Sequence, residues 1–249
     1  MAEHPESELA SLIGSAAELL RWEEEALGGQ GFPASTAVDE RDSAVVVASG
    51  DPVVPSENET SSPRERLRLL EAEASECVRC ELHAHRSRSV FARGNPETDL
   101  VFVGEGPGYN EDQQGLPFVG RAGQLLDRMI GAMGYGRDEV YICNVVKCRP
   151  PDNRTPLPSE AAACAHFLVP QLQAVNPKVI VALGRCAAEN LQCVPPTGKW
   201  RGVWGEWQGI PVMPTYHPAF LLRSPEFKKP VWEDLKAVLH KLGRPLPQR

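Results

Sequence analysis

Four cysteines with uneven spacing are the residues of this chain whose type and spacing most clearly predict chemistry. Cys77 and Cys80 form a Cys-x2-Cys pair; 67 residues separate Cys80 from Cys148, and 15 separate Cys148 from Cys164. A structural zinc ribbon would repeat its pair within about 20 residues, and this chain does not. Single thiolates from separate segments suit a cubane iron-sulfur cluster, which usually takes four cysteine ligands. The spacing favours such a cluster, with zinc and unligated buried cysteines as alternatives.

The other three cysteines, Cys143, Cys186 and Cys193, lie in or beside apolar runs, where small buried hydrophobes are expected. The odd total of seven cysteines indicates a reducing compartment. The sequence contains no apolar segment near 20 residues and no basic-then-apolar start. We therefore expect a cytoplasmic protein that neither enters nor crosses a membrane.

Charge divides the chain into two parts. Residues 1–62 carry 13 acidic residues against two arginines, so this segment has a charge of −11 and leaves +4 for residues 63–249. Apolar residues at helical spacing predict a short amphipathic helix within residues 6–27, and residues 28–62 have the composition of a disordered linker. We expect an acidic extension over 1–62 and a mildly basic domain over 63–249, a balance that suits a polyanionic partner.

The domain has the pattern of an α/β fold. After a helix expected over residues 64–76, four short apolar runs alternate with helical stretches; the runs are DLVFVGEG, EVYICNVV, KVIVALG and IPVMPTYH. Near-continuous apolar strands between helices predict a parallel sheet covered on both faces. Ligands of such sheets bind at the carboxyl ends of the strands.

Polar and aromatic residues gather at these predicted strand ends. The first run leads into a glycine-rich loop, residues 104–120, that contains Glu105, Glu111 and Phe118. Asn144 ends the second run and His217 follows the fourth. The Lys-Ser/Thr pair of a phosphate loop is missing, which disfavours a nucleotide hydrolase. Each residue also has an ordinary interpretation: a capping asparagine, a surface histidine or a core phenylalanine.

Several longer motifs resemble one family. GEGPGYNED, GLPFVGRAGQLL, NVVKCRPP and HPAFLLR, in this order and with the four cysteines, are similar to the family 4 uracil-DNA glycosylases over residues 64–242. The resemblance implies a three-layer α/β/α sandwich with a four-stranded central parallel sheet. It also implies a [4Fe-4S] cluster on the four cysteines. The expected function is DNA repair: a monomer would flip uracil out of single- or double-stranded DNA and hydrolyse its N-glycosidic bond, leaving an abasic site.

Base removal assigns roles to the strand-end residues. The base must leave the stack and enter a pocket, where Phe118 would stack on it and the amide of Asn144 would read its O4 and N3–H. His217 would donate to O2, where negative charge develops as uracil leaves. The best-known uracil glycosylase family has an aspartate at the position of Gly106, in the substrate-binding loop. Glu105 or backbone carbonyls would therefore position the attacking water.

Further roles follow from the resemblance and from known ways in which proteins contact DNA. Glu111 would lie beside the C5 edge of uracil and exclude the methyl group of thymine. In HPAFLLR, Leu221 would fill the gap left by the extruded base. Phosphate contacts are expected from basic residues near the strand ends, namely Lys147, Arg149, Arg154 and Arg223. A non-enzymatic iron-sulfur or zinc protein that binds nucleic acid remains the alternative; it would share the cysteines but would not need Phe118, Asn144 and His217 together.

Overall fold

The computed structural model describes residues 62–194 and 199–247. The predicted N-terminal amphipathic helix and linker lie outside these residues, so the two-part organisation of the chain stays a prediction. The described domain opens with α3 (Pro63–Glu76), which confirms the helix expected over residues 64–76. No helix in the described ranges is long and apolar enough to span a membrane.

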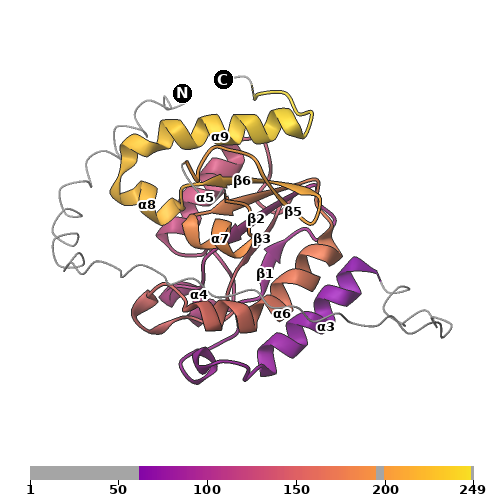
Figure 1. The fold of residues 1–249 in the computed structure, drawn as a ribbon, viewed down its shortest axis with the longest axis vertical. Helices are drawn as coiled ribbons and strands as arrows, with labels where there is room; N and C mark the ends of the chain where they lie inside the picture. Colours follow the sequence, from indigo (N-terminus) through magenta and orange to yellow (C-terminus); the bar gives the residue numbers. More distant parts are fainter. Residues whose placement is uncertain (1–61, 195–198, 248–249) are drawn as a thin grey trace, which may run out of the picture. The chain divides into compact units, whose positions relative to one another are not determined.

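A six-stranded mixed sheet forms the centre of the domain (Figure 1). Its strands run in the order β1-β3-β2-β4-β6-β5. The four predicted runs form β2 (Leu100–Gly104), β3 (Tyr141–Asn144), β4 (Val179–Leu183) and β6 (Ile210–Thr215), which pair in parallel. Two antiparallel edge strands, β1 (Ala92–Gly94) and β5 (Gly205–Trp207), were not predicted. The expected four-stranded sheet is thus only the parallel centre of a larger one.

Helices cover both faces of this sheet. Figure 1 shows α3 beside α6 on one side, and α5, α8 and α9 on the other. The remaining helices are α4 (Tyr109–Gln114), α5 (Arg121–Ala132), α6 (Pro158–Val175), α7 (Arg185–Asn190), α8 (Pro218–Arg223) and α9 (Lys228–Lys241). The α/β/α layering expected from the alternating strands and helices is confirmed.

Alternating side chains of the strands build two cores. On β2, Val101 and Val103 pack with α3 and α6, whereas Leu100 and Phe102 pack with α5 and α9. This alternation explains the continuous apolar runs, because both faces of each central strand are buried. The side chains that follow the strands are therefore held at one edge of a rigid sheet.

Candidate active site and four-cysteine pocket

Gly104, Asn144 and Phe118 meet at the carboxyl ends of β2 and β3. Gly104 is the register partner of Asn144. A Cβ atom on Gly104 would lie 2.4 Å from Asn144 Oδ1 and 2.5 Å from Phe118 Cζ. The absence of a side chain at Gly104 therefore lets the amide and the aromatic ring approach each other.

The Asn144 side chain is buried without a complete set of partners. The residue is 1% exposed, and its Oδ1 atom accepts no hydrogen bond within the described part of the chain. A buried acceptor left unpaired costs about 1–3 kcal/mol. Such an atom beside an aromatic ring indicates a place for a ligand that brings its own N–H donor.

His217 lies beside this amide-aromatic pair as a neutral imidazole. Its ring centroid is 5.6 Å from that of Phe118, with 31° between the ring planes. Burial, helped by the nearby Arg223 charge, lowers the pKa of His217 to about 4. Its Nδ1 accepts a hydrogen bond of 3.1 Å from the backbone N–H of Ala219 at the start of α8. A neutral imidazole that accepts at Nδ1 carries its proton on Nε2, so His217 can donate there.

Glu105 and His217 share a cleft of about 370 Å³. Burial raises the pKa of Glu105, and a hydrogen bond from the Thr155 side chain partly opposes this rise. Three aromatic residues that were not predicted also line the cleft, namely Trp200, Tyr216 and Phe220. Two of them flank His217 closely in sequence, which is the only signal that marks them.

Gly106 lies where any side chain would be crowded. A Cβ atom there would be 2.8 Å from Val146 Cγ2. The packing therefore leaves no room for an aspartate unless Val146 moves. Because position 106 has no room for a carboxylate, the carboxylate of this loop that faces the cleft is that of Glu105.

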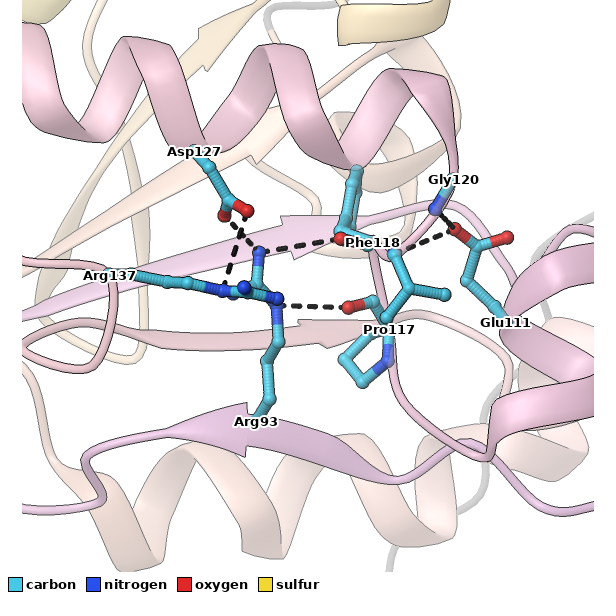
Figure 2. A network of polar contacts seen from close by, with 8 residues as sticks. Arg93, Glu111, Pro117, Phe118, Gly120, Asp127 and Arg137 are labelled. Atoms are coloured by element: carbon cyan, nitrogen blue, oxygen red, sulfur yellow. Dashed lines mark hydrogen bonds and ion pairs between the residues drawn. The ribbon is translucent and has the colours of Figure 1, made fainter.

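Glu111 contacts the loop that carries Phe118. Its Oε1 atom accepts hydrogen bonds from the backbone N–H groups of Val119, at 2.9 Å, and Gly120, at 2.8 Å. On the other side of the loop, Arg93 donates to backbone carbonyls and pairs with Asp127 (Figure 2). Arg93 was not predicted, because it belongs to the three-residue edge strand β1.

Two residues with predicted contacts to DNA are buried in this structure. Leu221 is 1% exposed and packs in the core under α8, so its side chain does not point outward as a wedge in this conformation. Its neighbour Leu222 is only partly buried. Lys147 is also 1% exposed and therefore does not present its charge to phosphates. Its ammonium group instead donates to the backbone carbonyl of Asn144, at 2.8 Å, and to Gln171 Oε1, at 2.6 Å.

The other predicted phosphate contacts lie nearer the surface. Arg154 is exposed but forms two hydrogen bonds with Glu160, at 2.7 and 2.8 Å. The Arg149 guanidinium lies 5.2 Å from the centre of the Tyr109 ring. Arg223 is partly exposed and close enough to His217 to influence its pKa.

The four cysteines line one pocket although they come from distant segments. Cys77 and Cys80 follow α3, Cys148 follows β3 and Cys164 lies on α6. The pKa of Cys164 is raised to about 11, mainly by burial; the Lys147 charge and backbone N–H oppose this rise, and the neighbouring Cys148 and Cys80 contribute to it. These thiols are therefore close enough to influence one another.

Basic groups also surround this pocket. Arg86 donates to Cys148 Sγ at 3.1 Å, and the backbone N–H of Lys147 donates to Cys164 Sγ at 3.3 Å. Within residues 62–194 and 199–247, no three Cys, His, Asp or Glu side chains are arranged to hold a single metal ion. Four cysteines around one pocket are the usual ligand set of an iron-sulfur cluster, and N–H groups directed at two of the sulfurs are the hydrogen bonds such ligands take.

Comparison with known proteins assigns the chain to a defined family. The family model described as the uracil DNA glycosylase superfamily matches residues 91–236, more than half of the chain. The chain is a member of that superfamily.

Individual relatives identify the branch. The type-4 uracil-DNA glycosylase of Thermotoga maritima is 48% identical over 178 residues, which cover 69% of this chain and 92% of the relative. Those of Archaeoglobus fulgidus and Saccharolobus solfataricus are 41% and 39% identical, over 74% and 72% of this chain and 96% and 88% of the relatives. The chain belongs to the type-4 uracil-DNA glycosylases.

Proposed function

We propose that this protein removes uracil from DNA by hydrolysing the N-glycosidic bond of a flipped-out deoxyuridine, as a DNA repair enzyme. The observation that carries the proposal is the unpaired Asn144 Oδ1 atom, buried beside Phe118 and His217. Uracil N3–H supplies the donor that this atom lacks, and uracil O4 accepts from the Asn144 amide nitrogen. Cytosine has no N3–H and carries an amino group at C4, so it fails at both positions.

Stacking and leaving-group stabilisation follow from the neighbouring side chains. Phe118 offers its ring to the face of the base, as expected for a pocket that holds an extruded nucleotide. His217 donates from Nε2 to uracil O2, where charge accumulates as the glycosidic bond breaks. A neutral imidazole serves this purpose, because it already carries the required proton.

The carboxylates have separate roles. Glu105 positions and polarises the water that attacks the sugar; its raised pKa makes the carboxylate a better proton acceptor near neutral pH. Gly106 allows the backbone of this loop to lie close to the substrate. Glu111 stands at the C5 edge and excludes a methyl group. Arg223 contacts the DNA backbone, and partly exposed Leu222 is a better candidate than buried Leu221 for the wedge.

The four cysteines would hold a [4Fe-4S] cluster of structural function. When bound, the cluster supplies four iron-sulfur bonds that tie the end of α3 to the β3-α6 connection. Hydrolysis of a glycosidic bond transfers no electrons, so the reaction assigns no redox step to it. Arg86 and Lys147 offset the negative charge of the four thiolates.

The proposed activity is tested by release of free uracil from an oligonucleotide with one uracil, single-stranded or paired with guanine. Asn144→Ala should abolish most release, while His217→Ala should slow single-turnover cleavage by about 100-fold or more with little loss of DNA binding. Arg137→Met is a matched surface control and should behave as wild type. No uracil release by wild-type protein carrying its iron, or equal loss of binding and cleavage in His217→Ala, would contradict these roles.

A further inference from the structure

Phe118 has a backbone conformation that must be held in place. Its φ angle is +56°, in the left-handed region that residues other than glycine rarely adopt. It lies in a short connection between α4 and α5, and its ring is 5% exposed. A strained conformation persists only where the surroundings determine it, and such strain is common at functional sites.

One side of this connection is bound by a cation. The Arg93 guanidinium donates from Nε to the Pro117 carbonyl at 3.0 Å and from Nη2 to the Phe118 carbonyl at 3.4 Å (Figure 2). The side chain is only 8% exposed, and its charge is balanced by an ion pair with Asp127 on α5. Arg137 reaches the same carboxylate, at 3.4 Å, but is 56% exposed.

The other side is bound by an anion. Glu111 approaches from α4 and accepts from the N–H groups of Val119 and of Gly120; Figure 2 shows Glu111 beside Gly120. Four consecutive residues, 117–120, thus have backbone groups held by two side chains of opposite charge. Gly123 completes the arrangement, because a Cβ atom there would lie 1.9 Å from the Phe118 carbonyl oxygen.

We propose that Arg93 is a positioning residue of the uracil pocket, which acts through the Phe118 carbonyl to hold the Phe118 ring against the base. This inference rests on the proposed stacking role of Phe118. The guanidinium binds two successive carbonyls, a geometry that a single ammonium group does not reproduce. Arg93, held by its ion pair with Asp127, and Glu111 fix the two ends of the same segment, so the ring direction is set before the base arrives.

A double-mutant cycle tests the proposal. The variants are Arg93→Met, Phe118→Ala and their combination, and the measurement is single-turnover release of uracil from an oligonucleotide. Arg93→Met should slow release by about 10-fold or more, since small misplacement of a binding group is costly. In the Phe118→Ala background the same change should cost less than about two-fold, because Arg93 has lost the group through which it acts.

Three further measurements separate positioning from general destabilisation. Arg137→Met removes a partner of the same Asp127 carboxylate without touching residues 117–120, and it should stay within about two-fold of wild type. Arg93→Lys keeps a charge and should not restore the rate. Inhibition by free uracil should weaken in Arg93→Met, while affinity for an oligonucleotide without uracil stays unchanged.

Each contrary result would refute a different part of the proposal. Equal costs of Arg93→Met in the wild-type and Phe118→Ala backgrounds would make Arg93 an ordinary structural residue. Full rescue by lysine would reduce its role to charge balance. A Phe118→Ala variant as fast as wild type would refute the stacking role itself and the inference with it. If Arg93→Met does not fold, Asp127→Asn replaces it in the cycle, because this change keeps the guanidinium but removes its counter-charge. The effect of Asp127→Asn on the rate should likewise be lost in the Phe118→Ala background.

Discussion

At the scale of single residues, the pocket contains two groups whose state without substrate already suits the reaction. Asn144 keeps an acceptor free, and His217 keeps a proton on the nitrogen that faces away from α8. The unpaired acceptor of Asn144 is unfavourable in a buried side chain, whereas the neutral imidazole of His217 is the form that burial favours. A base with a matching edge would supply the donor that Asn144 lacks and the acceptor for the His217 proton, so recognition and leaving-group stabilisation are prepared in the folded chain.

The lowered pKa of His217 leads to a pH prediction. Between its unfolded value near 6.5 and its folded value of about 4, the imidazole stays neutral in the folded protein. The ratio of wild-type to His217→Ala single-turnover rates should therefore be nearly constant from about pH 8 to about pH 5.5. A ratio that changes sharply around pH 6.5 would show that the imidazolium is the working form.

The same pKa has a consequence for stability with a definite sign. Between about pH 6.5 and pH 4, the unfolded chain binds a proton at His217 and the folded chain does not. The free energy of unfolding therefore has its full value above pH 6.5 and falls as pH drops toward 4. The free energy of unfolding of His217→Gln should depend less on pH over this interval. Chemical denaturation at several pH values measures the difference, and parallel curves for the two proteins would contradict it.

The unpaired amide predicts a separation of stability from activity. Asn144→Ala should lose activity yet keep its melting temperature within about 2 °C of wild type, because loss of an orphaned acceptor offsets the small cavity. Gln171→Ala is the matched control. That buried amide accepts from Lys147 and donates to Tyr141 and to the Phe91 carbonyl, so its removal should lower the melting temperature by several degrees. Equal losses would mean that Asn144 is structurally paired.

At the scale of secondary-structure elements, the four-cysteine pocket joins the end of α3 to the β3-α6 connection and to α6, the helix that packs beside α3. Cys148→Ala and Cys164→Ala should lose most iron and become less stable, because the connection between β3 and α6 is no longer tied to the end of α3. Iron analysis of wild-type protein should give about four atoms per chain. Cys193→Ala, which changes a buried thiol outside the pocket, should retain its iron. Stoichiometric zinc without iron in wild type would refute the cluster.

The central parallel strands could be predicted from sequence, whereas the two edge strands could not. The four parallel strands have side chains buried on both faces and therefore form continuous apolar runs. Edge strands β1 and β5 have three residues each and mixed burial, which is too little for a periodic signal. Arg93 was missed for this reason, since its partners lie 24 to 34 residues further along the chain.

The residues of the candidate site also differ in how far the sequence alone could identify them. Asn144 and His217 were found because they follow recognisable strands, and Phe118 because it belongs to a long motif. The prediction of Leu221 as the wedge could not take burial into account, because two adjacent leucines on a short helix give no indication of which one faces the core. Lys147 was likewise taken for a surface charge, although the partners that permit its burial come from β3 and α6.

At the scale of the whole molecule, the uneven charge predicts how the extension affects DNA binding. Residues 1–62 carry −11 and residues 63–249 carry +4. Removal of residues 1–62 should leave iron content and single-turnover cleavage nearly unchanged but increase affinity for nonspecific DNA. The increase should be largest at low salt, because charges more than about 10 Å apart are screened at 0.1 M.

A salt series on full-length and truncated protein measures this effect. Equal affinities at the lowest salt would make the extension electrostatically neutral toward DNA. Loss of folding on truncation would show instead that the extension belongs to the domain.

The position of Gly104 tolerates no side chain. One added methyl group would fall within 2.5 Å of both the amide oxygen and the ring that we propose to receive the base. A chain with alanine at this position would keep its strands, its cysteines and its overall similarity to the family. Its pocket, however, would be blocked by the added methyl group. When genomes are surveyed for chains of this family, glycine at the end of this strand is therefore a simple criterion for separating working enzymes from inactive descendants.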